Sequence, residues 1–176
     1  MTSFDDFVKK QNEKAKPIPA FNPQERIDMF KKHVEEFYDL VCKEWLKENI
    51  EKGLIVTKRH PIRVYEESLG IYDIDALVIN IGNIVINLRP IGTILIGTRG
   101  RIDISYRSRS GMFVLTGENI DSPSAHIVIS VNGEKPPKQK DPGREVWKFV
   151  DRRGMMNYVS LNAEVFQQII MELING

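Results

Sequence analysis

The chain has 176 residues, of which 41% are apolar and 28% charged, and its formal net charge at pH 7 is +1. This length and composition are typical of one globular domain whose core is large enough to fold without disulfides or metals. The near-neutral charge argues against polyanion binding over the whole surface, although it is compatible with a local basic patch.

A single cysteine, Cys42, excludes an intramolecular disulfide and a thiolate metal cluster. The first residues carry early acids and no apolar segment, so they do not resemble a secretory signal. No run approaches the roughly 20 apolar residues that span a bilayer. We therefore expect a cytoplasmic protein with no membrane partner, and no motif in the sequence indicates a cofactor.

The first 21 residues are expected to form a flexible or docking segment. Within it, residues 3–15 have the apolar spacing of a short helix, with a capping box over residues 3–6. Prolines keep residues 16–19 extended. Residues 22–176 are expected to form a single α+β domain.

The next segment carries the strongest helix signals. Asn22 is a favourable N-cap, Pro23 suits the first helical position, and Gly53 suits the position after the last residue. We expect one helix of about 45 Å that ends near Lys52. Its buried stripe comprises Ile27, Phe30, Val34, Phe37, Val41 and Trp45, flanked by Tyr38, Leu46 and Ile50.

After Gly53 the hydrophobic period changes to two, which predicts short strands separated by Gly, Asn, Pro and Ser turns. Such short connections favour antiparallel neighbours. A final helix begins near Asn162. The expected fold is α+β: a curved antiparallel meander of about 7–9 strands, with the long N-terminal helix and the C-terminal helix packed on one face. The segments with strand signals are 54–58, 62–67, 72–81, 84–89, 93–97, 101–107, 112–116, 125–131, 145–150 and 155–160.

Three acids raise the question of a metal-dependent phosphodiester enzyme. Asp73 and Asp75 share a strand face, Asp103 lies on another strand, and carboxylate pairs suit Mg²⁺ or Mn²⁺. The further motifs of nucleotidyltransferases and nucleases do not accompany them. We interpret them as surface acids on a strand end, and this enzyme hypothesis is the least favoured.

The other reactive residue types do not form a catalytic motif. His33, His60 and His126 lack the spacing of metal ligands and are interpreted as structural, and Cys42 lies among apolar helix residues. No catalytic or metal-binding residues are therefore assigned, and a non-catalytic protein is favoured over an enzyme.

Arginines cluster around two turns, at Arg99, Arg101, Arg107 and Arg109, and Arg152–Arg153 occupy a third. If these turns lie at one end of the sheet, they form a phosphate-binding rim. Nucleic-acid or nucleotide binding through the first four arginines is the alternative function, and it is not favoured.

The favoured function is binding to another protein through the long helix, as an inhibitor, an immunity-type protein or an adaptor. A helix of about 45 Å is longer than a typical strand, so part of its apolar stripe is expected to overhang the sheet. Exposed aromatic residues are common interface anchors. The partner is another protein chain or a second copy in a homodimer, and the residues assigned to the interface are Phe30, Trp45, Leu46 and Ile50.

Overall fold

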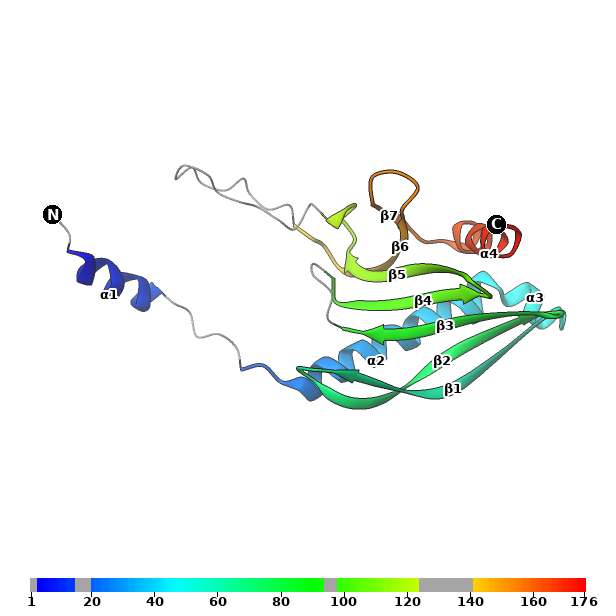
Figure 1. Cartoon of the computed structure of the whole chain (residues 1–176), viewed down its shortest axis with the longest axis horizontal. Coiled ribbons are helices and arrows are strands. Elements are labelled where there is room, and N and C mark those ends of the chain that lie inside the picture. Colours follow the sequence, from blue (N-terminus) through cyan, green and yellow to red (C-terminus); the bar gives the residue numbers. More distant parts are fainter. Residues whose placement is uncertain (1–2, 15–19, 94–97, 124–140) are drawn as a thin grey trace.

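The computed structural model describes residues 3–14, 20–93, 98–123 and 141–176. Its centre is an open antiparallel sheet of seven strands in the order β1-β2-β3-β4-β5-β6-β7, so each strand pairs with its neighbours in sequence (Figure 1). The strands are β1 (Ile55–Glu66), β2 (Gly70–Ile81), β3 (Ile84–Gly92), β4 (Gly100–Tyr106), β5 (Arg109–Gly117), β6 (Glu145–Asp151) and β7 (Asn157–Ser160). The predicted α+β class and antiparallel meander are confirmed.

The helices lie before and after the sheet in the chain: α1 (Phe4–Lys14), α2 (Pro23–Asp39), the π-helical segment η1 (Leu40–Trp45), α3 (Lys47–Glu51) and α4 (Ala163–Asn175). Helices α2, η1 and α4 share one hydrophobic core with the sheet. Helix α1 lies apart from the sheet (Figure 1), and the side chains of Phe4 and Phe7 are exposed. Its role as a docking segment stays a prediction. Among the described helices, none combines the length and apolar character needed to cross a membrane.

Asparagine caps begin the two helices that cover the sheet; the sequence predicts the cap at Asn22 and the start of the second helix near Asn162. The side chain of Asn22 accepts hydrogen bonds from the amides of Gln24 and Glu25, at 3.1 and 3.2 Å. The side chain of Asn162 accepts one from the amide of Val165 at 2.8 Å. Each cap satisfies amides that have no partner within the helix.

The predicted long helix is not one continuous α-helix. It changes to π geometry at Leu40, and the amide of Leu46 donates to the carbonyl of Val41, five residues back, at 2.9 Å. The wider turn brings both Trp45 and Leu46 into the core, with 9% and 2% exposure. Leu46 then leaves helical geometry, and α3 follows as a separate short helix.

The strand boundaries also differ from the prediction. β1 is one strand of 12 residues that runs through Pro61, where two strands were expected. Because β1 is an edge strand that pairs only with β2, it tolerates a residue without an N–H. The predicted strand at 125–131 lies outside the described residues, as does most of the one at 93–97.

Phe37 of α2 is the centre of the hydrophobic core. It is fully buried, and its ring contacts the neighbouring helical segment, two strands and the C-terminal helix. The ring centroids lie 5.9 Å from Trp45, 5.1 Å from Phe113, 5.5 Å from Trp147 and 6.3 Å from Phe166. Such aromatic pairs add to the energy of area burial, so this one side chain joins α2, η1, β5, β6 and α4.

The sheet divides where β2 separates from β3. β3 pairs with β2 only from Leu77↔Leu88 to Ile81↔Ile84, although β2 pairs with β1 over its whole length. The hydroxyl of Tyr38 on α2 fills this division, donating to the carbonyl of Asp75 at 2.9 Å and lying 3.4 Å from that of Leu88. A helix side chain thus bonds to the β2 backbone at Asp75, beyond the last pair of β2 with β3.

Glu66 closes the same division at the far end of β1. Its carboxylate accepts hydrogen bonds from the hydroxyl of Tyr72 and from both the amide and the hydroxyl of Thr93, the latter two at 3.0 and 2.9 Å. The β1–β2 hairpin is therefore fastened to the end of β3 by side-chain contacts instead of a strand ladder.

A buried lysine lies on the face of β6 opposite the main hydrophobic core, where it binds the loop that follows β5. Lys148 is 1% exposed, and its ammonium donates to the carbonyls of Glu118 and Ile120, both at 2.8 Å, and to the carboxylate of Asp121 at 3.3 Å. These three acceptors compensate for the loss of water around the charge. The loop after β5 is thereby held over a second, small apolar cluster that contains Val150 and Tyr158.

We expect Phe37→Ala to lower the free energy of unfolding by about 3–5 kcal/mol, because it leaves a cavity among five structural elements. Urea denaturation followed by circular dichroism measures this loss. Met29→Ala removes a 45%-exposed side chain from the same helix and should change stability by no more than about 0.5 kcal/mol. A loss below about 1 kcal/mol for Phe37→Ala would contradict the central position of this ring.

Two tyrosines should make the fold sensitive to alkaline pH. Burial raises the pKa of Tyr38 and Tyr72 above the ordinary value of 10.0, and the Glu66 carboxylate raises that of Tyr72 further. Above pH 10 the unfolded chain loses these protons while the folded chain keeps them. We expect the free energy of unfolding to fall there by about 1.4 kcal/mol per pH unit for each tyrosine.

Urea denaturation at several pH values tests this slope. Tyr38→Phe should make it shallower, whereas Tyr65→Phe, which alters a 70%-exposed ring, should leave it unchanged. Equal slopes in the wild type and Tyr38→Phe would refute the assignment.

Candidate functional site

The residues predicted to form a protein interface on the long helix lie mainly in the core. Phe30, Trp45 and Leu46 are buried, and Ile50 is partly buried against the same core. The ring of Trp45 packs on Phe166 of α4 at 5.1 Å. The helix therefore does not present this stripe to another chain, because the sheet and α4 cover it.

The four predicted arginines do not form one rim. Arg99 precedes β4, whereas Arg107 and Arg109 follow it, so they lie at opposite ends of a seven-residue strand. Arg99 pairs with Glu145 at 2.8 Å, and Arg107 lies over the ring of Tyr106 at 5.1 Å from its centroid. The two turns belong to successive hairpins, which necessarily point in opposite directions.

The three predicted acids are also separated. Asp73 pairs with Arg63 on the surface at 3.2 Å, and Asp103 pairs with Arg101 through two hydrogen bonds of 2.6 and 2.8 Å. The side chain of Asp75 is half-buried on β2. Across the described ranges, no group of three or more His, Cys, Asp or Glu side chains could hold a metal ion.

Two other residues considered in the sequence have structural surroundings. His33 lies between two carboxylates, with Nδ1 3.2 Å from Glu36 and Nε2 3.0 Å from Glu145. Cys42 is partly buried, and its burial raises the pKa of the thiol, which disfavours the reactive thiolate. His126 lies outside the described residues.

The sheet has a second division, between β5 and β6, and this one opens into a cavity. The last pair between the two strands is Phe113↔Phe149. On β5, residues 109–112 continue with only β4 as a partner; on β6, residues 150–151 continue with only β7. We call this opening, bounded by these two strand segments and by α4, the β5–β6 fork.

The hairpin before β5 determines which backbone groups face the fork. Its loop has two residues, so the flanking pair Tyr106–Arg109 is hydrogen-bonded, and hydrogen-bonded pairs then alternate along the ladder. Ser110 and Met112 consequently lie at non-hydrogen-bonded positions relative to β4. Their N–H and C=O groups point toward the fork, where no described strand pairs with them.

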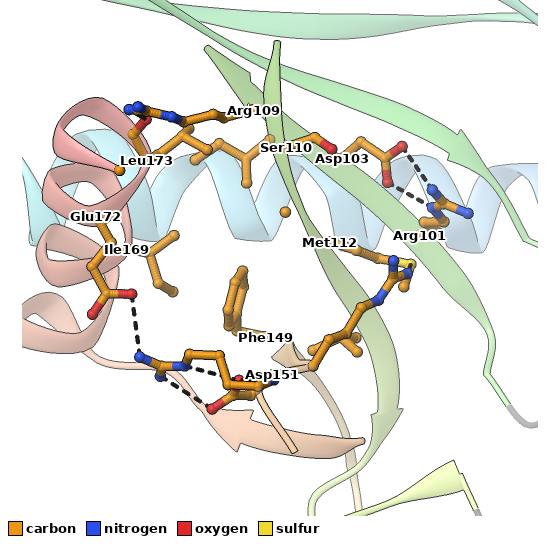
Figure 2. Close-up of a pocket in the computed structure, with 16 residues that line it drawn as sticks. Arg101, Asp103, Arg109, Ser110, Met112, Phe149, Asp151, Ile169, Glu172 and Leu173 are labelled. Carbon is orange, nitrogen blue, oxygen red and sulfur yellow. Dashed lines mark hydrogen bonds and ion pairs between the residues drawn. The ribbon is translucent and has the colours of Figure 1, made fainter. Parts of the chain in front are cut away.

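The fork encloses a cavity of about 530 Å³ with an apolar floor and a charged rim. Figure 2 shows the ring of Phe149 between Ile169 of α4 and Met112 of β5, with Ser110 above it. Gly111 allows this arrangement, because a Cβ there would lie 2.8 Å from the Phe149 ring. A hydrophobic floor beneath a strand edge that no described strand pairs with suits an extended peptide, whose backbone can bond to the edge and whose apolar side chains can contact the floor.

Most of the charges around the fork are already paired. The guanidinium of Arg109 donates to the carbonyls of Leu173 and Ile174 at the end of α4, at 3.2 and 2.7 Å, a favourable place for a cation. Arg153 pairs with Asp151 at 3.1 Å, and this hydrogen bonding lowers the pKa of the Asp151 carboxyl. These contacts hold α4 and the turn after β6 at the two sides of the opening.

Arg152 is the exception among the fork's cations. Among the described residues its only polar contact is with the sulfur of Met112, at 4.0 Å. It therefore leaves one guanidinium at the rim with no carboxylate partner in the described part of the chain.

Of the four arginines proposed from the sequence, Arg101 and Arg109 line the fork, and their role in binding stays a prediction. The sequence does not reveal the fork itself or the significance of Arg152. The one local signal is the composition of residues 109–112, Arg-Ser-Gly-Met, which is weakly apolar for a strand inside a sheet.

Comparisons with known proteins do not assign a function to this arrangement. No protein-family model matches the chain, and neither a curated protein nor a solved structure matches it.

Proposed function

We propose that the chain is a non-catalytic binding protein that takes up an extended segment of another protein in the β5–β6 fork. The observation that carries this proposal is the edge of β5 at Ser110 and Met112, which no described strand pairs with and which opens onto an apolar floor. Strand addition to such an edge is a common mode of peptide recognition, in which backbone hydrogen bonds supply affinity.

The dimensions support a short strand. The four residues of β5 that border the fork, 109–112, extend about 13 Å at the rise of a β-strand. A bound segment of similar length presents alternate side chains to Phe149 and Ile169 below and to solvent above. We therefore expect a segment of about four residues with apolar side chains at alternate positions.

The rim supports an acidic side chain within or next to that segment. Arg152 lacks a carboxylate partner in the described residues, whereas Arg101, Arg109 and Arg153 have acceptors. A ligand carboxylate near Arg152 completes the pairing through charge-assisted hydrogen bonds. The proposed partner is thus an extended acidic-apolar segment of another protein.

We expect Ser110→Pro to weaken strand addition without opening the β4–β5 ladder. Proline removes the N–H that points into the fork and leaves the bonds to β4, which come from neighbouring residues. The probe is a displayed library of random linear peptides selected on the wild-type protein. The affinity of an enriched peptide should fall about tenfold or more in Ser110→Pro.

Ser110→Thr is the matched control, because it keeps the N–H and changes the same side chain. It should bind the selected peptide with wild-type affinity. Selection of no peptide above background, or equal binding by Ser110→Pro, would contradict the proposal. A second copy of the chain as the partner would appear as a dimer that Ser110→Pro dissociates.

A further inference from the structure

Helix α1 carries an apolar side that no other described element covers. The side chains of Phe4, Phe7 and Val8 are exposed, and the rings of Phe4 and Phe7 stack with their centroids 6.4 Å apart. An isolated helix of 11 residues is only marginally stable in water, because most helical stability comes from the packing of an apolar side. The helix therefore indicates a surface against which these three side chains pack.

An apolar hollow lies at the tip of the β1–β2 hairpin. It has a volume of about 610 Å³ and lies between the hairpin tip, the end of β3 and the start of β4. Its apolar surface comes from Tyr65 and Ile91, and Ile71 lies directly across the ladder from Tyr65. All three side chains are exposed, Ile71 at 64% and Ile91 at 37%. Exposed apolar side chains that gather around a hollow are typical of an interaction surface. We call this surface the hairpin hollow.

The start of α2 lies close to the hairpin hollow. The ring of Phe30 packs against Gly100, where a Cβ would lie 2.8 Å from it, and the next residue, Arg101, lines the hollow. Phe30 lies about 10 Å along the helix from Pro23, the first residue of α2. Figure 1 shows the start of α2 and the tip of the β1–β2 hairpin at the same end of the sheet.

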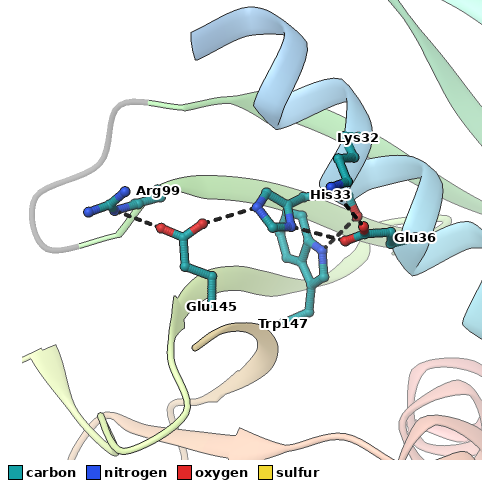
Figure 3. A network of polar contacts seen from close by, with 6 residues as sticks. All are labelled: Lys32, His33, Glu36, Arg99, Glu145 and Trp147. Atoms are coloured by element: carbon teal, nitrogen blue, oxygen red, sulfur yellow. Dashed lines mark hydrogen bonds and ion pairs between the residues drawn. The ribbon is translucent and has the colours of Figure 1, made fainter. Parts of the chain in front are cut away.

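A polar network fixes this half of α2 to the sheet. The indole of Trp147 on β6 donates to the carbonyl of His33 at 3.0 Å, and Nε2 of His33 lies 3.0 Å from Glu145. Figure 3 shows Glu145 between His33 and Arg99, with which it pairs at 2.8 Å. The point at which the N-terminal segment joins α2 is therefore held in place relative to the hairpin hollow.

The linker is long enough to bring α1 to the hairpin hollow. Nine residue steps separate Lys14, the last residue of α1, from Pro23. At about 3.1 Å per residue for a proline-containing linker, these steps reach about 28 Å. This reach covers both the roughly 10 Å along α2 to Phe30 and the roughly 10 Å between packed layers. Helix α1 can therefore dock on its own chain.

The charges of the two surfaces are complementary. Lys10 comes three residues after Phe7 and therefore lies on the same side of α1. The hairpin hollow carries the exposed carboxylate of Glu67, and Arg101 in its lining is already paired with Asp103 at 2.6 Å. A lysine beside apolar side chains suits such a surface, because its stem contacts apolar groups while its ammonium reaches the carboxylate.

We propose that α1 docks in the hairpin hollow of its own chain, with its apolar side against Ile71 and Ile91 and with Lys10 beside Glu67. NMR relaxation of the backbone amides in the full chain measures whether α1 moves with the sheet. When α1 is docked, its amides have order parameters of about 0.85, as in the rigid sheet, whereas a helix that is only tethered has values below about 0.6.

The double variant Ile71→Ser/Ile91→Ser removes the apolar contacts of the hollow. It should lower the order parameters of α1 below about 0.6 and leave those of the sheet unchanged. Val85→Ser is the matched control, since it makes a similar change at an exposed position of β3, at the opposite end of that strand. Glu67→Lys should also loosen α1, and Lys10→Glu in the same chain should restore its order, because the charges are then exchanged.

Four results would overturn the proposal. They are order parameters below about 0.6 for α1 in the wild type, unchanged values in Ile71→Ser/Ile91→Ser, an equal loss in Val85→Ser, and a dimer in analytical ultracentrifugation whose dissociation releases α1. The last result would place α1 on a second copy instead of its own chain. Because no peptide is added, these results are independent of binding in the fork.

Discussion

The structure depends on the packing of Phe37 against aromatic rings from both ends of the chain. Phe113, Trp147 and Phe166 reach it from β5, β6 and α4, and Trp45 reaches it from η1. Large aromatic side chains dominate core energetics because each removes a large area from water. The sheet curves around this cluster, and its inner residues therefore stay in contact with α2. The curvature also affects the pairing of strands on either side of the cluster.

One consequence is that neighbouring strands separate in two places. Where β2 leaves β3, side chains replace the missing ladder: Tyr38 bonds to strand carbonyls, and Glu66 bonds to Thr93. Where β5 leaves β6, the described residues supply no such replacement at Ser110 and Met112. The first division is bridged by these side chains. The second leaves backbone groups available, which is why the proposed partner is placed there.

Local sequence patterns predicted the features of the fold that depend on residues close together in the chain, namely helix starts and strands. Asn22 caps α2, the last helix begins near Asn162, and alternating apolar residues define an antiparallel meander. The π segment was not predictable, because the spacing from Val41 to Trp45 fits an α-helix equally well. The fork depends on where β6 stops following β5, which long-range packing decides. Its arginines could be identified as charges, but whether each has a partner depends on the folded geometry: Arg109 bonds to α4, whereas Arg152 has no carboxylate partner in the described part of the chain.

Amide hydrogen exchange of the free protein, resolved by residue, tests the open edge of β5 most directly. The account predicts slow exchange at Gly111 and Phe113, whose amides face paired strands, and exchange at least about tenfold faster at Ser110 and Met112, whose amides face the fork. Protection of Ser110 and Met112 equal to that of Gly111 would contradict the account, because it would mean that the fork is already closed in the free chain.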